Sequence, residues 1–225
     1  MNLVYALFKD AAQDIDKLYP ELNYGEDAGM PMVSGILVLR DDNHNNYDSY
    51  NITIRPTKEY PMRFPLVFET GGRLPVNVDW HVFESDGHCC IKTIPEEILI
   101  CKNKITLNQF IEDHVSPYFA GQSFREENGF YLHERSHGIQ GTIEFLKESL
   151  ITDDLLKVYE LLSFIIKQKE PGRTHQCFCG KKMKYRKCHR NAFRTLSLLD
   201  VGYLKYFQRE IRNSDEYILP SLNLK

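Results

Sequence analysis

Two stretches in the first half of the chain decide the fold: Tyr60-Pro-Met-Arg-Phe-Pro65 and His81-Val-Phe-Glu-Ser-Asp-Gly-His-Cys-Cys-Ile91. The prolines of the first stretch set the shape of a turn, because proline fixes φ and has no backbone N–H to give to a strand. Residues 66–70 lie between the two stretches and have the composition of a β-strand that ends at a pair of glycines. The sequence therefore places two adjacent thiols in a loop that follows a turn and a strand.

More strands precede this turn, and no helix pattern separates them. The predicted strands are residues 35–40, 50–55 and 66–70. Consecutive strands without helices between them favour an antiparallel meander over a parallel sheet. At the N-terminus, apolar residues at helical spacing predict a helix over residues 4–19 that ends at Pro20. The Gly- and Pro-rich residues 21–32 are predicted to form a loop.

Helix patterns dominate the rest of the chain. Thr106 is a good N-cap, and apolar spacing predicts a helix from Thr106 to Phe119. Three further helices are predicted, over residues 138–147, 152–168 and 191–211. The fold class expected is therefore α+β: an antiparallel meander flanked by helices over residues 1–150, followed by a helical C-terminal extension over residues 151–225.

The composition excludes a disordered chain and a membrane span. The 225 residues are 42% hydrophobic and include 13 Tyr and 13 Phe, which is enough apolar surface for a sizeable core. The longest apolar runs are far shorter than a membrane span requires. The N-terminus has no basic region or cleavage site typical of a secretory signal, so we expect a cytoplasmic protein with reduced cysteines.

The C-terminal part carries the pattern of a metal site. Cys177-Phe-Cys179 is followed by eight residues and then by Cys188-His189. Three thiols and one imidazole within so short a segment match a closed tetrahedral zinc site. A segment of this length cannot build its own core, so zinc would supply its folding energy and play a structural role.

Basic side chains surround this predicted site. Residues 171–225 contain twelve Lys and Arg against four Asp and Glu, whereas the rest of the chain is acidic. The basic segment could bind a nucleic-acid backbone, with Phe178 and Tyr185 stacking on bases. The alternative is a solvated face on a structural knuckle. The basic residues concerned are Lys181, Lys182, Lys184, Arg186, Lys187 and Arg190.

One further string resembles a metal motif. Residues His133-Glu134-Arg135-Ser136-His137 spell His-Glu-x-x-His, which binds zinc when it lies on a helix. Gly138 follows at once and is unlikely to continue a helix. The string is therefore predicted to be a structural loop.

Taken together, the turn and the cysteine segment resemble the ubiquitin-conjugating (UBC) family. That family has a Tyr-Pro-x-x-x-Pro turn, a His-Pro-Asn stretch and a Gly-x-x-Cys-Leu segment with the thioester-forming cysteine. The matching residues here are Tyr60, Pro61, Pro65, His81, Gly87, Cys90 and Ile91. The resemblance covers roughly residues 1–120 and is closest to the divergent bacterial branch. It implies a UBC-like fold in which Cys90 forms a thioester.

Two departures from the family pattern concern the chemistry. Val82 and Phe83 follow His81, where the family has Pro and Asn. That Asn is linked to stabilising the oxyanion, and Phe83 cannot donate a hydrogen bond, so another donor or geometry must serve. The chain also has about six extra residues around Gly71 to Pro75.

The resemblance and the residue types assign roles around Cys90. A neighbouring His⁺ raises the thiolate share of a cysteine, and His81 and His88 are the candidates. His81 is also expected to be a structural hydrogen-bonding residue rather than a base. Asp86 could accept the proton of an incoming amine. Cys89 and Cys101 are expected to be buried and structural.

Three functions are open. The zinc segment resembles the SEC-C motif, and bacterial UBC-like proteins with such tails are encoded beside cGAS-like nucleotidyltransferases in CBASS anti-phage operons. The first function is therefore a conjugating enzyme whose acyl donor is such a nucleotidyltransferase's C-terminus or a ubiquitin-like protein. The second is an inactive UBC-like module that docks protein or nucleic acid through its zinc knuckle. The third is a Cys–His hydrolase that removes conjugates, for which no orienting Asn or Asp can be assigned.

Overall fold

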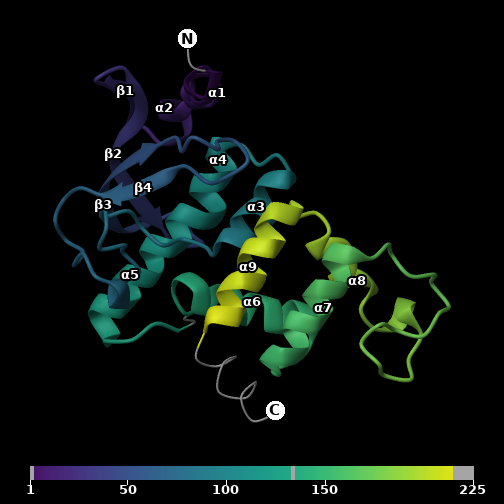
Figure 1. Ribbon diagram of the computed structural model, residues 1–225. Coiled ribbons are helices and arrows are strands. Elements are labelled where there is room, and N and C mark those ends of the chain that lie inside the picture. Colours follow the sequence, from purple (N-terminus) through teal and green to yellow (C-terminus); the bar gives the residue numbers. More distant parts are fainter. Residues whose placement is uncertain (1–2, 133–134, 215–225) are drawn as a thin grey trace. The chain divides into compact units, whose positions relative to one another are not determined.

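The computed structural model describes residues 3–132 and 135–214. The chain forms two compact units, one from Met1–Lys92 with Ile100–Glu134 and one from Thr93–Leu99 with Arg135–Lys225 (Figure 1). These units are divided differently from the expected domains, residues 1–150 and 151–225. The reason is that the helix before residue 150 buries Ile143, Leu146 and Leu150 in the core of the second unit.

The first unit is built on a four-stranded antiparallel sheet in the order β1-β2-β3-β4. The predicted α+β class and the antiparallel meander are confirmed. The strands are β1 (Leu22–Asp27), β2 (Met30–Arg40), β3 (Asn46–Arg55) and β4 (Leu66–Glu69). Buried residues alternate along β3, where Tyr50, Ile52 and Ile54 point into the core. One face of the sheet is therefore covered and the other is more exposed.

The prediction of a loop over residues 21–32 is wrong. These residues form β1, a tight turn and the start of β2. Ala28 and Gly29 both have positive φ, at 48° and 78°, which is the geometry of a two-residue hairpin turn. The glycine therefore marks a hairpin rather than an irregular loop. The polar side chains of β1, which lies at the edge of the sheet, concealed the strand.

Gly35 allows β1 to join the sheet. It pairs with Leu22, and its φ of 143° is rarely open to residues with a side chain. A Cβ atom at this position would lie 2.0 Å from the main-chain oxygen of Glu21. The first strand can therefore lie against β2 only because residue 35 is glycine.

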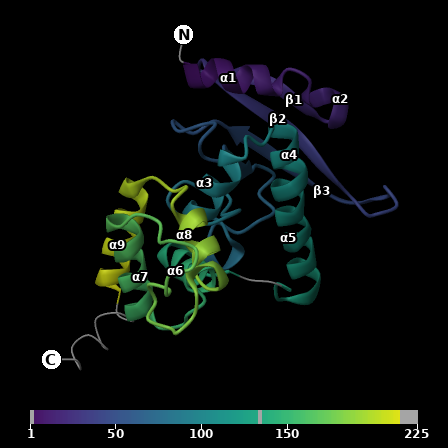
Figure 2. The same cartoon turned by 90° about the vertical axis from the view of Figure 1, so that its right-hand side faces the viewer.

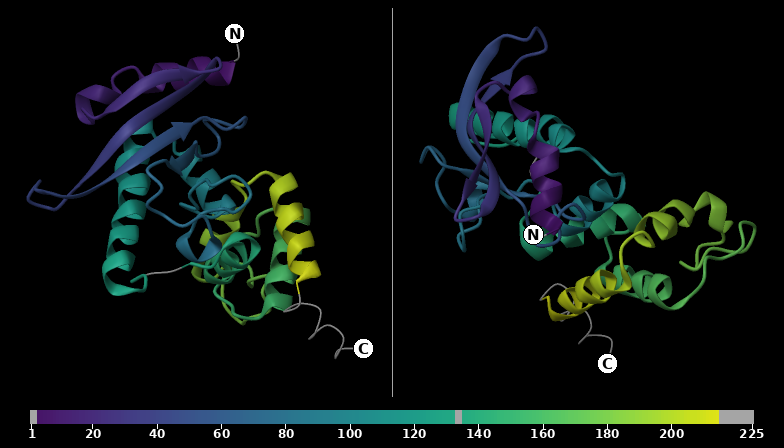
Figure 3. Two further views of the ribbon diagram at one scale, coloured as in Figure 1. Left: turned by 90° about the vertical axis from the view of Figure 1, so that its left-hand side faces the viewer. Right: turned by 90° about the horizontal axis from the view of Figure 1, so that it is seen from above.

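Helices complete the core of the first unit. Helices α1 (Leu3–Ala12) and α2 (Ile15–Leu18) divide the single helix predicted over residues 4–19, and α1 lies beside β2 (Figure 3). Thr106 and Gln109 form a capping box at the start of α4 (Leu107–Phe110), which confirms the predicted N-cap. The helix continues through a π-helical turn, Ile111–Val115, into α5 (Ser116–Asn128), well beyond Phe119 (Figure 2). Helix α3 (Ile94–Lys102) was not predicted, and its residues up to Leu99 belong to the second unit.

The second unit is helical. It contains α6 (Gly138–Leu150), α7 (Leu155–Lys167), a short 3-10 turn at Tyr185–Lys187, α8 (Arg190–Leu196) and α9 (Val201–Asn213). Helices α7 and α9 lie side by side. Asp154 caps α7, where Thr152 was expected. The helix predicted over residues 191–211 is divided into α8 and α9. No helix within the described ranges has the length and apolar composition needed to cross a membrane.

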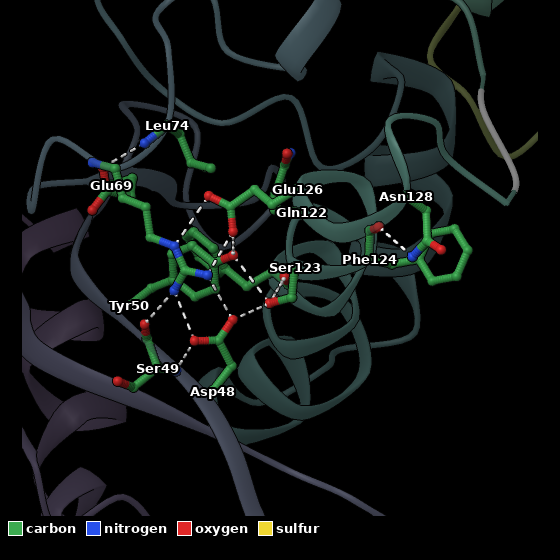
Figure 4. Close-up of polar contacts among 12 residues, drawn as sticks. Asp48, Ser49, Tyr50, Glu69, Leu74, Gln122, Ser123, Phe124, Glu126 and Asn128 are labelled. Atoms are coloured by element: carbon green, nitrogen blue, oxygen red, sulfur yellow. Dashed lines mark hydrogen bonds and ion pairs between the residues drawn. The ribbon is translucent and has the colours of Figure 1, made fainter.

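Arg73 fastens residues 71–75 to the core of the first unit, at a place where Asp48, Ser123 and Glu126 lie close together (Figure 4). Its guanidinium donates two hydrogen bonds to Asp48, at 2.7 and 2.8 Å, and also bonds Glu126 of α5. It lies over the Tyr50 ring, 4.1 Å from the centroid. Ser123 donates a further hydrogen bond to Asp48. The hydrogen bond from Arg73 is the main reason why the pKa of Asp48 is lowered from 3.8 to about 2.

The role of Gly35 can be tested by comparing its replacement with that of Gly29, a second glycine with positive φ. Gly35→Ala should lower the free energy of unfolding by roughly 2–4 kcal/mol, because it adds both strain and a backbone clash. Gly29→Ala is the matched control, since nothing lies within 4 Å of its Cβ position, and it should cost only about 1 kcal/mol. Urea unfolding measures both values. Equal losses would contradict the role given to Gly35.

The Arg73–Asp48 pair should make the free energy of unfolding depend on pH. Because the pKa of Asp48 is lowered on folding, its contribution is complete above pH 3.8 and is lost as the pH falls towards about 2. The Asp48→Asn variant should be less stable at pH 6 and should lose less stability than the natural protein on acidification. Urea unfolding at several pH values measures this difference. Parallel pH profiles would exclude the pair as its source.

Candidate functional site

Backbone hydrogen bonds fix the cysteine loop of the first unit. The amide of Cys90 donates to the carbonyl of His81 at 2.7 Å, and the amide of Cys89 donates to Val67 of β4 at 2.7 Å. Gly87 turns the loop with a φ of 80°. The loop is therefore an ordered extension of the sheet, which is what a rigidly held nucleophile needs.

The three cysteines of the first unit differ in exposure. Cys89 is 5% exposed, and burial raises the pKa of its thiol to about 12. Cys101 on α3 is 6% exposed. The predictions that these two cysteines are buried are confirmed, and both are poor nucleophiles. Cys90 is partly exposed, and its Sγ lies within 4.8 Å of a ring nitrogen of His81.

The other two predicted residues of this site pair with each other. Nδ1 of His88 lies 2.5 Å from Oδ1 of Asp86, and the His88 ring stacks on Phe83 with centroids 4.2 Å apart. Partial burial opposes ionisation of Asp86, but the hydrogen bonds from His88 lower the pKa of this carboxyl. The structure thus places His81 beside Cys90 and Asp86 beside His88. Phe83, at the position of the family's Asn, contributes a ring contact.

The residues that hold His81 were not among those predicted from the sequence. Tyr118 on α5 donates to the His81 carbonyl at 2.9 Å. Gln122, one helical turn later, is 1% exposed and donates to the Trp80 carbonyl at 3.0 Å. The Tyr131 ring meets the His81 ring edge-on, with centroids 4.9 Å apart. A signal was available: Gln122 lies on the buried face of a helix, where a polar residue needs a partner.

The predicted metal ligands gather in the second unit. One potential ligand atom from each residue lies within 4.8 Å of the others, so the four residues are close enough to hold a metal ion: Cys177, Cys179, Cys188 and His189. Nδ1 of His189 lies 3.0 Å from the Cys188 sulfur and 3.4 Å from the Cys177 sulfur. The sulfurs of Cys179 and Cys188 are 3.7 Å apart.

The surroundings of His189 select the ligating nitrogen. Its Nε2 lies 2.8 Å from the Leu150 carbonyl, so Nε2 carries the proton and donates it. Nδ1 then keeps its lone pair and points at the sulfurs, as in many protein metal sites. Burial opposes ionisation of Cys177, but hydrogen bonds from the amides of Cys179 and His189 lower the pKa of that thiol. The donor set therefore suits a cation that prefers thiolate and imidazole.

The segment that carries these ligands packs on the helices through aromatic rings. Phe178 stacks on Phe164 of α7 with centroids 4.3 Å apart and an interplanar angle of 3°. Tyr185 is fully buried, so the expectation that it stacks on nucleic-acid bases is wrong. Its ring is part of the core instead, because it packs against Phe178 and Phe193. The exposed basic residues are Lys181, Lys182, Lys184, Arg186 and Lys187; Arg190 is partly buried.

The His-Glu-x-x-His string does not lie within a helix in its described part. His133 and Glu134 are outside the described residues, and α6 begins at Gly138, after the string ends. The motif requires both histidines on one helical face. Residues 135–137 are irregular, which agrees with the predicted loop.

The chain matches no protein-family model, no curated protein and no solved structure. Kinship with the UBC family thus stays a prediction that depends on the quoted motif residues.

The metal site gives a direct prediction. Purified protein should contain one bound metal ion per chain, and Cys179→Ser should release it because a serine oxygen is a poor replacement for a thiolate. The segment of residues 173–190 should then become sensitive to protease. Plasma mass spectrometry and limited proteolysis measure the two effects. Cys101→Ala is the control, which should keep the metal; a protease-resistant, metal-free natural protein would contradict the site.

Proposed function

We propose that this protein is a ubiquitin-conjugating-like acyl carrier: Cys90 accepts a protein C-terminus as a thioester and passes it to an amine. The observation that carries the proposal is the pairing of Cys90 with His81, whose ring nitrogen lies within 4.8 Å of the sulfur. Cys90 is accessible on a rigid loop, whereas Cys89 and Cys101 are buried. Acyl transfer needs an accessible thiol that can become a thiolate.

The chemistry has two balanced steps. The Cys90 thiolate attacks the carbonyl carbon of an activated C-terminus, a new C–S bond forms, and the bond to the original leaving group breaks. An amine then attacks the thioester, an amide bond forms, and the Cys90 thiolate leaves. The His81 imidazole would take up the thiol proton in the first step, a role as base that the sequence alone did not predict for it. Asp86, kept ionised by His88, is the candidate acceptor for the amine proton in the second.

The four candidate ligands of the second unit fit zinc best. Three thiolates and an imidazole would fill a tetrahedral set with no open position, which is typical of structural rather than catalytic zinc. Zinc would hold the ends of the segment together, and Phe178, between the first two cysteines, would anchor it on α7. We therefore assign zinc a folding role in a SEC-C-like knuckle.

On the motif resemblance, the proposal also names a cellular system in which the protein acts. A bacterial UBC-like protein with this tail fits CBASS anti-phage defence in the cytoplasm, with a cGAS-like nucleotidyltransferase or a ubiquitin-like protein as acyl donor. The second candidate function is an inactive docking module. It is favoured by Phe83, which stacks on His88 where the family has an oxyanion-stabilising Asn. In that case the exposed lysines of the knuckle would bind an acidic protein or nucleic acid.

A synthetic thioester distinguishes these functions. Incubation with a glycine-ended peptide α-thioester should give a covalent adduct on Cys90 that a reducing thiol removes. Cys90→Ala should abolish the adduct, and Cys90→Ser should give a slower-forming oxyester that resists thiols. Intact-protein mass spectrometry measures each product.

Cys89→Ala and Cys101→Ala are the matched controls and should keep the adduct, because both thiols are buried. A docking module would form no adduct with any variant. A hydrolase would cleave the thioester and accumulate an adduct only when turnover is blocked. An adduct that survives Cys90→Ala would contradict the assignment of the nucleophile.

A further inference from the structure

Helix α5 presents two polar side chains to the peptide that carries His81. Tyr118 and Gln122 are four residues apart and so share one face of the helix. The Tyr118 hydroxyl donates to the His81 carbonyl at 2.9 Å, and the Gln122 amide donates to the Trp80 carbonyl at 3.0 Å. The backbone of His81 is therefore fixed from the helix.

The carbonyl of His81 links this helix to the nucleophile. It accepts the Tyr118 hydroxyl at 2.9 Å and also the Cys90 amide at 2.7 Å. A carbonyl oxygen has two lone pairs, so both bonds can form together. A displacement of the His81 peptide would consequently move the backbone of Cys90 as well as the imidazole beside its thiol.

Gln122 also controls the ring of His81 through Tyr131. Gln122 uses the other end of its amide, since its Oε1 accepts the Tyr131 hydroxyl at 2.8 Å. The Tyr131 ring lies edge-on to the His81 ring at 4.9 Å and 72°. Arg125 lies over the rings of Trp80 and Tyr131, at 4.4 and 4.7 Å from their centroids. A fully buried amide with both ends bonded accepts few other arrangements.

We propose that Gln122 and Tyr131 are positioning residues for Cys90: Gln122 holds the backbone before His81, and Tyr131 holds the imidazole so that its nitrogen stays beside the sulfur. The inference rests on the proposed function, which gives Cys90 its chemistry. It adds Gln122 and Tyr131, which lie outside the UBC-like motif, to the residues that the site requires. A reaction slows steeply when one of the reacting groups is misplaced by about 1 Å.

Alkylation of Cys90 tests this without an acyl donor. Full-length protein is treated with iodoacetamide at pH 7, and the peptide with Cys90 is quantified by mass spectrometry. Gln122→Met and Tyr131→Leu should slow the alkylation about threefold or more, because the thiolate share falls when the imidazole is displaced. Tyr131→Phe keeps the ring but loses the hydrogen bond to Gln122, so its rate should lie between those of the natural protein and Tyr131→Leu.

Ser123→Ala is the matched control on the same helix. Ser123 is also buried, but its hydrogen bonds go to Asp48 and Tyr50 rather than to the His81 peptide. This variant should lose stability and keep the alkylation rate of the folded protein. Thermal unfolding confirms that every variant is folded under the conditions of the assay.

A double-mutant cycle with His81→Asn separates positioning from general loosening. If Tyr131 and Gln122 act through the imidazole, their substitutions should have little further effect once His81 is replaced. Equal slowing with and without His81, or natural rates in Gln122→Met and Tyr131→Leu, would overturn the proposal. If the substitutions slow alkylation independently of His81 while the thioester adduct still forms, only the positioning role is refuted. If their effect depends on His81 but no thioester adduct forms, the acyl-carrier function is refuted instead.

Discussion

The main-chain carbonyl of His81 is the point on which the candidate site depends. It accepts hydrogen bonds from the Cys90 amide and the Tyr118 hydroxyl, and so joins the cysteine loop to α5. His81 has a φ of 52°, a conformation that a non-glycine residue keeps only when its surroundings enforce it. Gln122 supplies that enforcement one residue earlier, at Trp80. The position of the imidazole is therefore a property of helix packing rather than of the loop alone.

The second unit uses a comparable device around a different residue. His189 is buried, and its Nε2 is bound by the carbonyl of Leu150 at the end of α6. This bond directs Nδ1 towards the three thiols, so one histidine serves both helix packing and the candidate metal site. The aromatic stack of Phe178 on Phe164 holds the Cys177–Cys179 end of the segment on α7. Metal binding and helix packing thus stabilise the same segment.

The sequence predicted the parts of the molecule that local chemistry determines. The meander, the Thr106 cap and the four ligands from Cys177 to His189 depend on turn residues, capping and ligand spacing, and the structure has all of them in place. The strand β1 was missed because most of its side chains are polar and because its hairpin turn has a positive φ at Ala28, which no propensity indicates. Gln122 and Tyr131 were missed because their partners are distant in sequence. Tyr185 was misjudged because a basic segment suggested exposure, whereas tertiary packing buries the ring.

The proposed acyl transfer needs a hydrogen-bond donor that stabilises its oxyanion. The amides of residues 81–83 and 87–90 all donate to acceptors within the protein, so these groups of the loop are already committed. Phe83 has no donor to offer. Among the side chains of the first unit, His81 has a ring nitrogen within 4.8 Å of the sulfur and could supply the hydrogen bond. Having taken the thiol proton, its imidazolium can return a hydrogen bond to the developing oxyanion. His81 would then act both as the base and as the oxyanion donor, which is why its placement by α5 matters.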